Sequence, residues 1–300
     1  MAYSLISLGA AAVGVAGAIA GAVMVRGTTA VPAAVWTAIA WLTLTGEMAV
    51  RSRGGLVEPG DAASMRLVVV AVSLCPAMSL LGAKRPQHGV WQFIVASLAI
   101  VLALPVGRAM AVMPGSMPDV HILAEWFMLI LAAVGWMNFI ATRRGVAATL
   151  ITTGQIVLMR PFLPGLAMES QITSVIAAPI VDCFAIGTAA LGTLFAVLQS
   201  WRRTALRPAG NRSAHPLAAL VDPPFMALRE TLGAAWALRI AERFDQIAAA
   251  RDWPCRLSFG GLSIAEPEAD AGWQRDAWRA FVALMRRFVT VEWLRRHDAR

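Results

Sequence analysis

The residue with the clearest chemical potential is Asp182, a carboxylate within a long apolar stretch. It lies eleven residues after Gln171, or roughly 16 Å along a helix, which places it near the middle of a bilayer. An ionisable side chain at that depth costs about 2.5–3.5 kcal/mol on insertion scales and persists where it faces a partner or a cavity. Pro179, three residues earlier, would free a backbone carbonyl near Val175. We therefore expect either an ion, proton or substrate site, or an aspartate that is protonated or hydrogen-bonded and ties helices together.

Further polar side chains are predicted to lie in the outer half of the membrane or near its middle, where Asp182 is expected. Glu47 and Arg51 are four residues apart, as are His121 and Glu125, so each pair shares one helical face. The first spacing suits an ion pair, and the second could supply an acid and a base for chemistry on a lipid-like substrate. We expect a polar pocket that opens outward and ends at Asp182. The intramembrane candidates are Asp182, Glu125, His121, Glu47 and Gln155.

Methionines precede His121 at short intervals. Met110, Met113 and Met117 together with this histidine offer thioether and imidazole ligands, which suit Cu(I). The chain has 14 methionines, however, so a chance cluster of these common gap-filling residues is the simpler interpretation. We predict no metal and no cofactor, with copper as the minor alternative.

The sequence lacks the common catalytic motifs. It has no His-Glu-x-x-His zinc-protease pattern, no Gly-x-Ser-x-Gly nucleophile elbow, no P-loop and no dinucleotide-binding fingerprint. Its three cysteines, Cys75, Cys183 and Cys255, cannot form a disulfide framework. These observations favour a non-enzymatic role.

The composition is that of a polytopic membrane protein. Of the 300 residues, 58% are hydrophobic and 15% charged, and the mean hydropathy is +0.64. A soluble globule of this composition would have too few charges to cover its surface, which excludes a cytosolic enzyme. A hydrocarbon layer about 30 Å thick needs about 20 apolar helical residues. We predict about seven spans, the sixth being short and polar, at 4–25, 31–50, 66–83, 89–106, 120–141, 145–159 and 172–198.

Basic residues predict the orientation of these spans. With the C-terminus in the cytoplasm, cytoplasmic segments near the membrane hold nine Lys or Arg and external segments hold five, with Arg51 and Arg66 counted as external. The doublets Lys84-Arg85 and Arg143-Arg144 both fall inside, which agrees with the positive-inside rule. We predict a multi-pass protein of the plasma (inner) membrane with its N-terminus outside and its C-terminal domain in the cytoplasm. Whether the sixth span crosses stays open, because without it the ratio falls to eight against six.

The first span carries small residues at a spacing that permits close helix packing. Gly17 and Gly21 form a small-xxx-small ridge, which lets another helix approach closely in lipid. Packing inside the bundle is favoured, and a seam that binds a protein partner is the alternative.

A basic linker at 201–212 leads to a soluble domain at 213–300. Asp222-Pro223 is typical of a helix start, and apolar residues then recur at helical spacing as far as Ile247. Two alternating runs flank Gly260-Gly261, which predicts a β-hairpin. A last helix is expected from about Asp270, so the predicted order is α-β-β-α.

Three arginines fall on the apolar side of the first helix of this domain. Arg229, Arg239 and Arg243 could place the helix on anionic headgroups. Alternatively, their stems could extend over the edge of a core, or they could pair with acids such as Glu230 or Glu242. The sequence pI is near 11, but acidic residues are interleaved and no nucleic-acid-reading motif is present, so we predict no nucleic-acid partner.

The predicted fold is therefore an all-α polytopic membrane bundle with a small α+β cytoplasmic C-terminal domain. The favoured function is a non-enzymatic subunit or scaffold of a membrane assembly, in contact with the lipid bilayer and with proteins bound through the first span or the C-terminal domain. A transporter or channel that uses Asp182 is the alternative, and a lipid-acting membrane enzyme is the second alternative. The substrate, the partner and the oligomeric state stay open.

Overall fold

A computed structural model gives the fold of the chain. It describes residues 2–55, 58–83, 88–112, 114–163, 177–205, 215–265 and 271–297.

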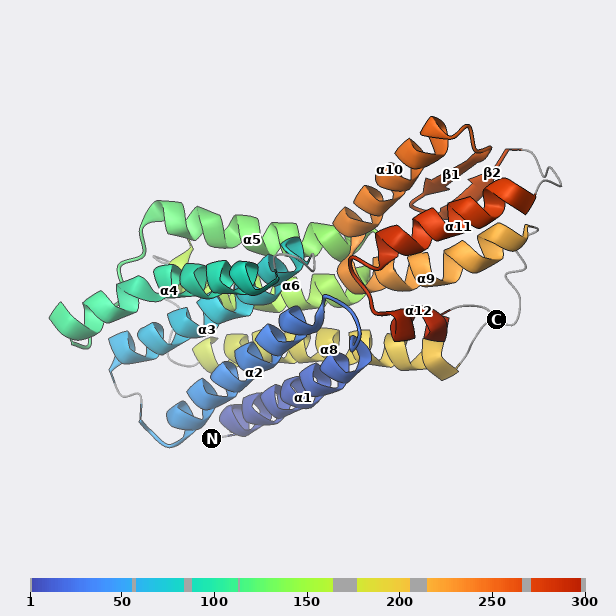
Figure 1. Cartoon of the computed structure of the whole chain (residues 1–300). Coiled ribbons are helices and arrows are strands. Elements are labelled where there is room, and N and C mark those ends of the chain that lie inside the picture. Colours follow the sequence, from blue (N-terminus) through green and yellow to red (C-terminus); the bar gives the residue numbers. More distant parts are fainter. Residues whose placement is uncertain are drawn as a thin grey trace.

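Long apolar helices form an elongated bundle, and a smaller domain lies at one of its ends (Figure 1). We call the end that carries this domain the near end, and the opposite end, where α2 stops and α3 begins, the far end. The bundle elements are α1 (Ala2–Met24), α2 (Val31–Ser52), α3 (Pro59–Leu81), α4 (His88–Val112), α5 (Ile122–Ile140), α6 (Gly145–Met159), the 3-10 turn η2 (Arg160–Phe162) and α8 (Ala177–Ala205).

Among the described residues, six helices are long and apolar enough to cross a membrane: Leu5–Met24, Val31–Ser52, Pro59–Leu81, Gly89–Val112, Ile122–Ile140 and Pro179–Arg202. Their outward faces are apolar, as the 73% exposure of Phe93 and the 59% exposure of Leu191 illustrate. Such a continuous apolar surface on a helical bundle indicates a membrane protein. Residues 164–176, which include the start of the predicted seventh span, lie outside the described residues.

The predicted sixth span is a helix with the expected bounds, but it is short. The 15 residues of α6 measure roughly 22 Å, so α6 is not among the six helices of spanning length. It runs antiparallel to α8, since Arg144 at its start bonds Ser200, while Gly154 lies against Ala185 and Ala189. A Cβ added to Gly154 would come within 2.5 Å of the Ala185 oxygen, so this close approach requires glycine.

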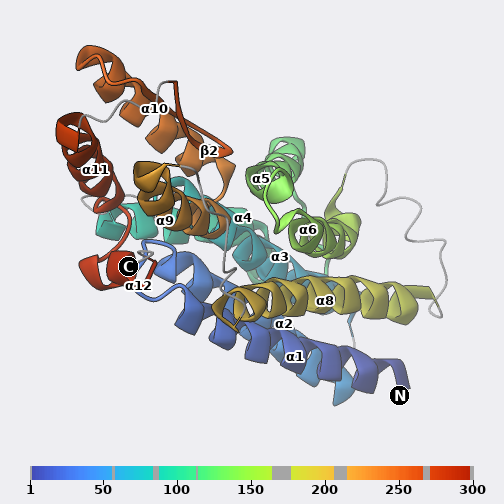
Figure 2. The ribbon, with the colours of Figure 1, turned by 90° about the vertical axis from the view of Figure 1, so that its right-hand side faces the viewer.

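Helix α3 lies at the centre of the bundle, packed against α2, α4, α5 and α6, while α8 lies between α1 and α6 (Figure 2). The core of the bundle includes Leu67, Val70 and Leu74 of α3, each 1% exposed or less. Of the two glycines of the predicted ridge, Gly17 faces α8, where an added Cβ would lie 3.0 Å from Thr193 Cγ2. Gly21 has no such neighbour within 4 Å.

The C-terminal domain contains the predicted hairpin with two helices on each side of it. The elements are α9 (Pro216–Leu232), α10 (Ala234–Ala250), β1 (Cys255–Ser258), β2 (Gly261–Ile264), α11 (Ala271–Met285) and α12 (Val291–His297). The strands pair antiparallel, with Ser258 opposite Gly261. The prediction of one helix before the hairpin and one helix after it was therefore wrong. The first is divided at Gly233, whose φ of +86° ends α9, and the last is followed by α12.

The predicted start of the first domain helix was also wrong. Helix α9 begins at Pro216, with His215 as its N-cap, and Pro223 lies in its interior. A second proline seven residues upstream offered the same start signal. The Asp222 carboxylate instead accepts a hydrogen bond from the backbone N–H of Leu262 at 2.8 Å, which attaches the hairpin to α9.

Asn138 of α5 joins the bundle to this domain at the break between α9 and α10. Its amide nitrogen donates to the Leu232 carbonyl at 2.9 Å, and its amide oxygen accepts from the Ala235 N–H at 3.0 Å. Both backbone groups lie at helix ends, where they have no partner within their own helix. One side chain therefore satisfies an orphan acceptor of α9 and an orphan donor of α10.

Other contacts fix the domain around that point. The buried Glu230 accepts from the Arg143 N–H at 3.1 Å, and the Trp236 indole donates to the Leu80 carbonyl at 2.7 Å. The loop after α1 pairs with the segment after α11 through an isolated bridge between Thr28 and Val289. The domain is thus bound to the bundle at three places: the loop after α1, the last turn of α3 and the loop after α5.

Replacing Asn138 with Leu should loosen the domain. Two helix-end groups would then lack partners, at about 1–3 kcal/mol each. Limited proteolysis in detergent is expected to digest the C-terminal domain of Asn138→Leu faster than that of the wild type. The neighbouring Met137→Ala, at a residue 62% exposed, is the matched control and should be cut at the wild-type rate. Equal rates for all three proteins would contradict this role of Asn138.

Candidate functional site

Four charged side chains from three helices form a closed set of ion pairs at the far end. Glu47 and Arg51 come from α2, Arg66 from α3 and Asp182 from α8. Each carboxylate contacts both arginines, and the two positive charges balance the two negative ones. We call these four residues the ion-pair ring.

Arg66 is the hub of the ion-pair ring. Its Nε lies 2.8 and 2.9 Å from the two carboxylate oxygens of Glu47, and its two terminal nitrogens each lie 2.9 Å from an oxygen of Asp182. The latter is a bidentate fork, the strongest geometry for an arginine–carboxylate pair. Arg51 adds a contact of 2.8 Å to Glu47 and one of 3.4 Å to Asp182.

The ion-pair ring is buried on one side and reaches the surface on the other. The side chain of Glu47 is 0% exposed and that of Arg66 is 4%, whereas those of Asp182 and Arg51 are 23% and 34% exposed. Removing two opposite charges from water together costs far less than removing either one alone. The ring therefore lets four charged residues sit between apolar helices without a net charge.

The local sequence explains how the partners are positioned. Glu47 and Arg51 lie one turn apart, and their predicted ion pair is present. Arg66 is the eighth residue of α3, because that helix starts at Pro59 rather than at residue 66. Sequence reasoning placed Arg66 at the first position of the span, counted it with the external basic residues and missed it as a site residue. Pro59, a typical first residue of a helix, was the signal that would have included it.

Asp182 lies nearer the far end than predicted. It contacts Arg51, the penultimate residue of α2, and so is level with the last turn of that helix. Pro179 lies in the first turn of the described part of α8, and Val175 lies outside the described residues. Asp182 joins α8 to α2 and α3, which corresponds to the helix-tying alternative.

The other predicted polar candidates do not join the ion-pair ring. His121 is the exposed N-cap of α5, its Nδ1 accepting from the Leu123 N–H at 3.2 Å, and the half-buried Glu125 follows in the first turn. Gln155 donates to the Ser73 carbonyl at 2.7 Å, one turn before Pro76. Within the described residues, these three side chains therefore do not meet Asp182.

The copper candidates are only partly described. Met110 and Met117 are 64% and 51% exposed, and Met113 lies outside the described residues. Within the described part of the chain, no group of three or more His, Cys, Asp or Glu residues could hold a metal ion.

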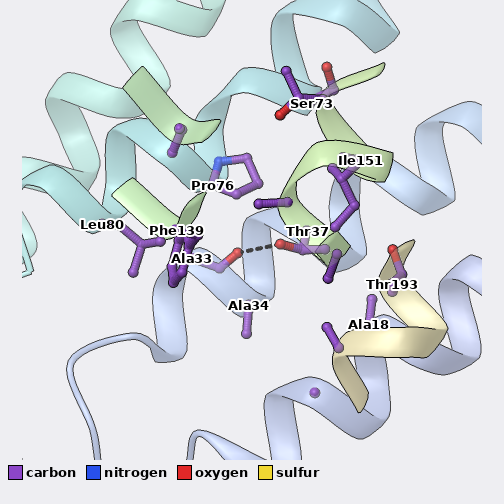
Figure 3. A pocket seen from close by; sticks show the side chains of 18 of the residues that line it. Ala18, Ala33, Ala34, Thr37, Ser73, Pro76, Leu80, Phe139, Ile151 and Thr193 are labelled. Carbon is purple, nitrogen blue, oxygen red and sulfur yellow. Dashed lines mark hydrogen bonds between the residues drawn. The ribbon is translucent and has the colours of Figure 1, made fainter. Parts of the chain in front are cut away.

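A separate cavity of about 310 Å³ lies between the bundle helices (Figure 3). Apolar residues from α1, α2, α3, α5, α6 and α8 form most of its lining. Thr37, Ser73 and Thr193 also line it, and each hydroxyl donates to a carbonyl of its own helix. These hydroxyl oxygens keep acceptor capacity, so the cavity suits an apolar ligand with a hydrogen-bond donor.

The cavity extends from the bundle core to the near end. Gln155 and Leu158 line its inner part, and Asn138 of α5 and Thr231 of α9 line it beside the C-terminal domain. Glu47, Arg66 and Asp182 are not among its lining residues. The ion-pair ring and the cavity are therefore two distinct features.

No protein-family model, curated protein or solved structure matches the chain.

Removing one charge from the ion-pair ring should destabilise the bundle, and removing a balanced pair should cost less. Asp182→Asn leaves Arg66 with an excess positive charge, and we expect a loss of about 3 kcal/mol, the low end for a broken buried pair because Asp182 is partly exposed. Asp182→Asn combined with Arg51→Gln leaves the neutral Glu47–Arg66 pair and should be more stable than Asp182→Asn alone. The free energy of unfolding of both variants is measured by titration with SDS in mixed micelles.

The control for this comparison is Asp61→Asn, which removes an exposed carboxylate from the first turn of α3. Its effect should stay within about 1 kcal/mol, the size of a helix-end charge effect. If Asp182→Asn is as stable as Asp61→Asn, the ion-pair ring does not hold the helices together.

Proposed function

We propose that the protein is a non-enzymatic subunit or scaffold of a membrane assembly, which holds its C-terminal domain at a fixed place on the bundle. The single observation that supports this most is the attachment of the domain through Asn138, Glu230 and Trp236. A domain on a flexible tether needs no such contacts, whereas a binding surface that must keep one orientation does.

The arrangement of the polar side chains supports the same proposal. Glu47 and Asp182, two carboxylates carried by bundle helices, are neutralised by arginines in the ion-pair ring. His121 caps a helix at the exposed far end. A carrier that used Asp182 for ion or proton binding would have to break a bidentate contact in each cycle, which disfavours that alternative.

The cavity favours a second candidate function, the binding or transport of an apolar ligand. Its volume of about 310 Å³ is at the lower end for small-molecule sites, and its walls are mostly apolar. This candidate does not depend on Asp182. It can be combined with the scaffold function if the ligand is a structural lipid.

Purification in a mild detergent followed by native mass spectrometry tests the scaffold proposal. We expect a stable heteromeric assembly of fixed stoichiometry for the wild type. Asn138→Leu, which loosens the domain, should lose the partner while the chain stays in the membrane, and Met137→Ala should keep it. A clean monomer with a bound small molecule would contradict the scaffold proposal and support the second candidate.

The proposed orientation places the near end and the C-terminal domain in the cytoplasm of a cell bounded by a plasma (inner) membrane. The near-end segments carry Arg26, Arg143, Arg144 and Arg202, and the sequence places Lys84 and Arg85 between α3 and α4. At the far end, Arg51 and Arg66 are neutralised in the ion-pair ring. This distribution supports an inside position for the near end.

Cysteine-accessibility labelling tests this orientation. In a background in which Cys75, Cys183 and Cys255 are replaced by Ser, a cysteine at Asp119 should react with a membrane-impermeant maleimide on intact cells, because it lies at the far end. A cysteine at the exposed Arg251 of the domain should react only after lysis. The opposite pattern, or labelling of both from outside, would overturn the orientation.

A further inference from the structure

A second hollow, of about 600 Å³, lies where the C-terminal domain meets the near end of the bundle. One wall consists of apolar and aromatic residues from the end of α3, the start of α4, the end of α11 and the segment after α11, including Leu81, Trp91 and Phe288. The other wall is the exposed face of α10. We call this hollow the domain cleft. It plays no part in the scaffold function proposed above.

The charged lining of the domain cleft is predominantly basic. It contains Arg239, Arg243 and Arg287 but only one acidic residue, Glu242. All three arginines are exposed, and none forms an ion pair with a carboxylate of the described residues. Their combined charge is therefore available to an anion that enters the cleft.

Two of the arginines have their positions restrained by neighbours. The Arg239 guanidinium lies 4.9 Å from the centre of the Trp236 ring, a cation–π arrangement. Arg243 donates to the Gln246 side chain at 3.0 Å. They are four residues apart on α10 and so share one face of that helix. Restrained guanidinium groups lose less entropy when they bind a phosphate than free ones do.

The domain cleft lies at the height where the apolar outer surface of the bundle ends. The Trp236 indole bonds the carbonyl of Leu80 in the last turn of α3, and the Trp91 indole bonds the carbonyl of Met78. Tryptophans that have one apolar and one polar side are typical of the membrane–water interface. Immediately beside them on α4, Val90 is 69% and Phe93 is 73% exposed.

We propose that the domain cleft binds the phosphate headgroup of an anionic phospholipid whose acyl chains lie on the apolar face of α4. The arginines of α10 and Arg287 contact the phosphate oxygens by charge-assisted hydrogen bonds, which are stronger than neutral ones. Trp91 and Val90 flank the start of the acyl chains. The lipid thereby contacts the bundle and the domain at once and strengthens their attachment.

The test uses the full chain in detergent and native mass spectrometry with added phosphatidylglycerol, phosphatidylcholine or inorganic phosphate. We expect phosphatidylglycerol to bind to the wild type more tightly than phosphatidylcholine. The double variant Arg239→Gln with Arg243→Gln should bind it about 30-fold more weakly, from about fivefold per basic residue at a membrane surface. Arg239→Lys with Arg243→Lys keeps the charge and should lose less.

The matched control is Arg275→Gln with Arg279→Gln, which removes two exposed arginines of α11 that do not line the domain cleft. This control should keep wild-type affinity. An equal loss of affinity in both double variants would show a general charge effect and overturn the site. Wild-type affinity in the Arg239→Gln, Arg243→Gln variant would also overturn it. Tight binding of inorganic phosphate without selectivity for phosphatidylglycerol would overturn the lipid assignment. If the Arg239→Gln, Arg243→Gln variant does not fold, Arg287→Gln replaces it in the test, and we expect it to bind phosphatidylglycerol about fivefold more weakly than the wild type.

Discussion

Arg66 is the charge on which the far end of the bundle depends. A guanidinium cannot lose its proton under ordinary conditions, so a buried arginine between apolar helices requires permanent negative partners. Glu47 and Asp182 supply them from two other helices, and Arg51 restores neutrality at the exposed side. The ion pairs of Asp182 with Arg51 of α2 and Arg66 of α3 meet that requirement, and through them Asp182 ties α8 to both helices.

At the near end, hydrogen bonds to backbone groups hold the C-terminal domain to the bundle. There, Asn138 and Trp236 use side-chain hydrogen bonds to satisfy or engage main-chain groups at helix ends. The C-terminal domain is therefore placed by groups that would otherwise lack partners. The bundle is fixed by charge at one end and by helix-end hydrogen bonds at the other, with a mostly apolar cavity between them. In our proposal this fixed geometry is the function, because it presents the domain to a partner in one orientation.

Local sequence patterns predicted the features that depend on neighbouring residues. The i, i+4 spacing gave the Glu47–Arg51 pair, Gly260-Gly261 gave the hairpin, and the apolar run from 145 to 159 gave α6. Contacts between distant segments could not be predicted in this way. Asp182 lies 116 residues from Arg66, and no spacing rule links them. The start of α9 was ambiguous because Pro216 and Pro223 carry the same signal, and the break at Gly233 depends on a positive φ that the apolar periodicity does not reveal.

The most direct test of the structural role of the ion-pair ring replaces all four residues at once, as Glu47→Leu, Arg51→Gln, Arg66→Met and Asp182→Leu. Apolar replacements of a whole buried ion-pair set are often neutral or stabilising. The quadruple variant is therefore expected to insert, to resist SDS unfolding as the wild type does, and to co-purify with the same partner, as measured by native mass spectrometry. A variant that folds and inserts normally but loses its partner or its activity in cells would contradict the account, because the four charges would then act in function rather than in holding the helices.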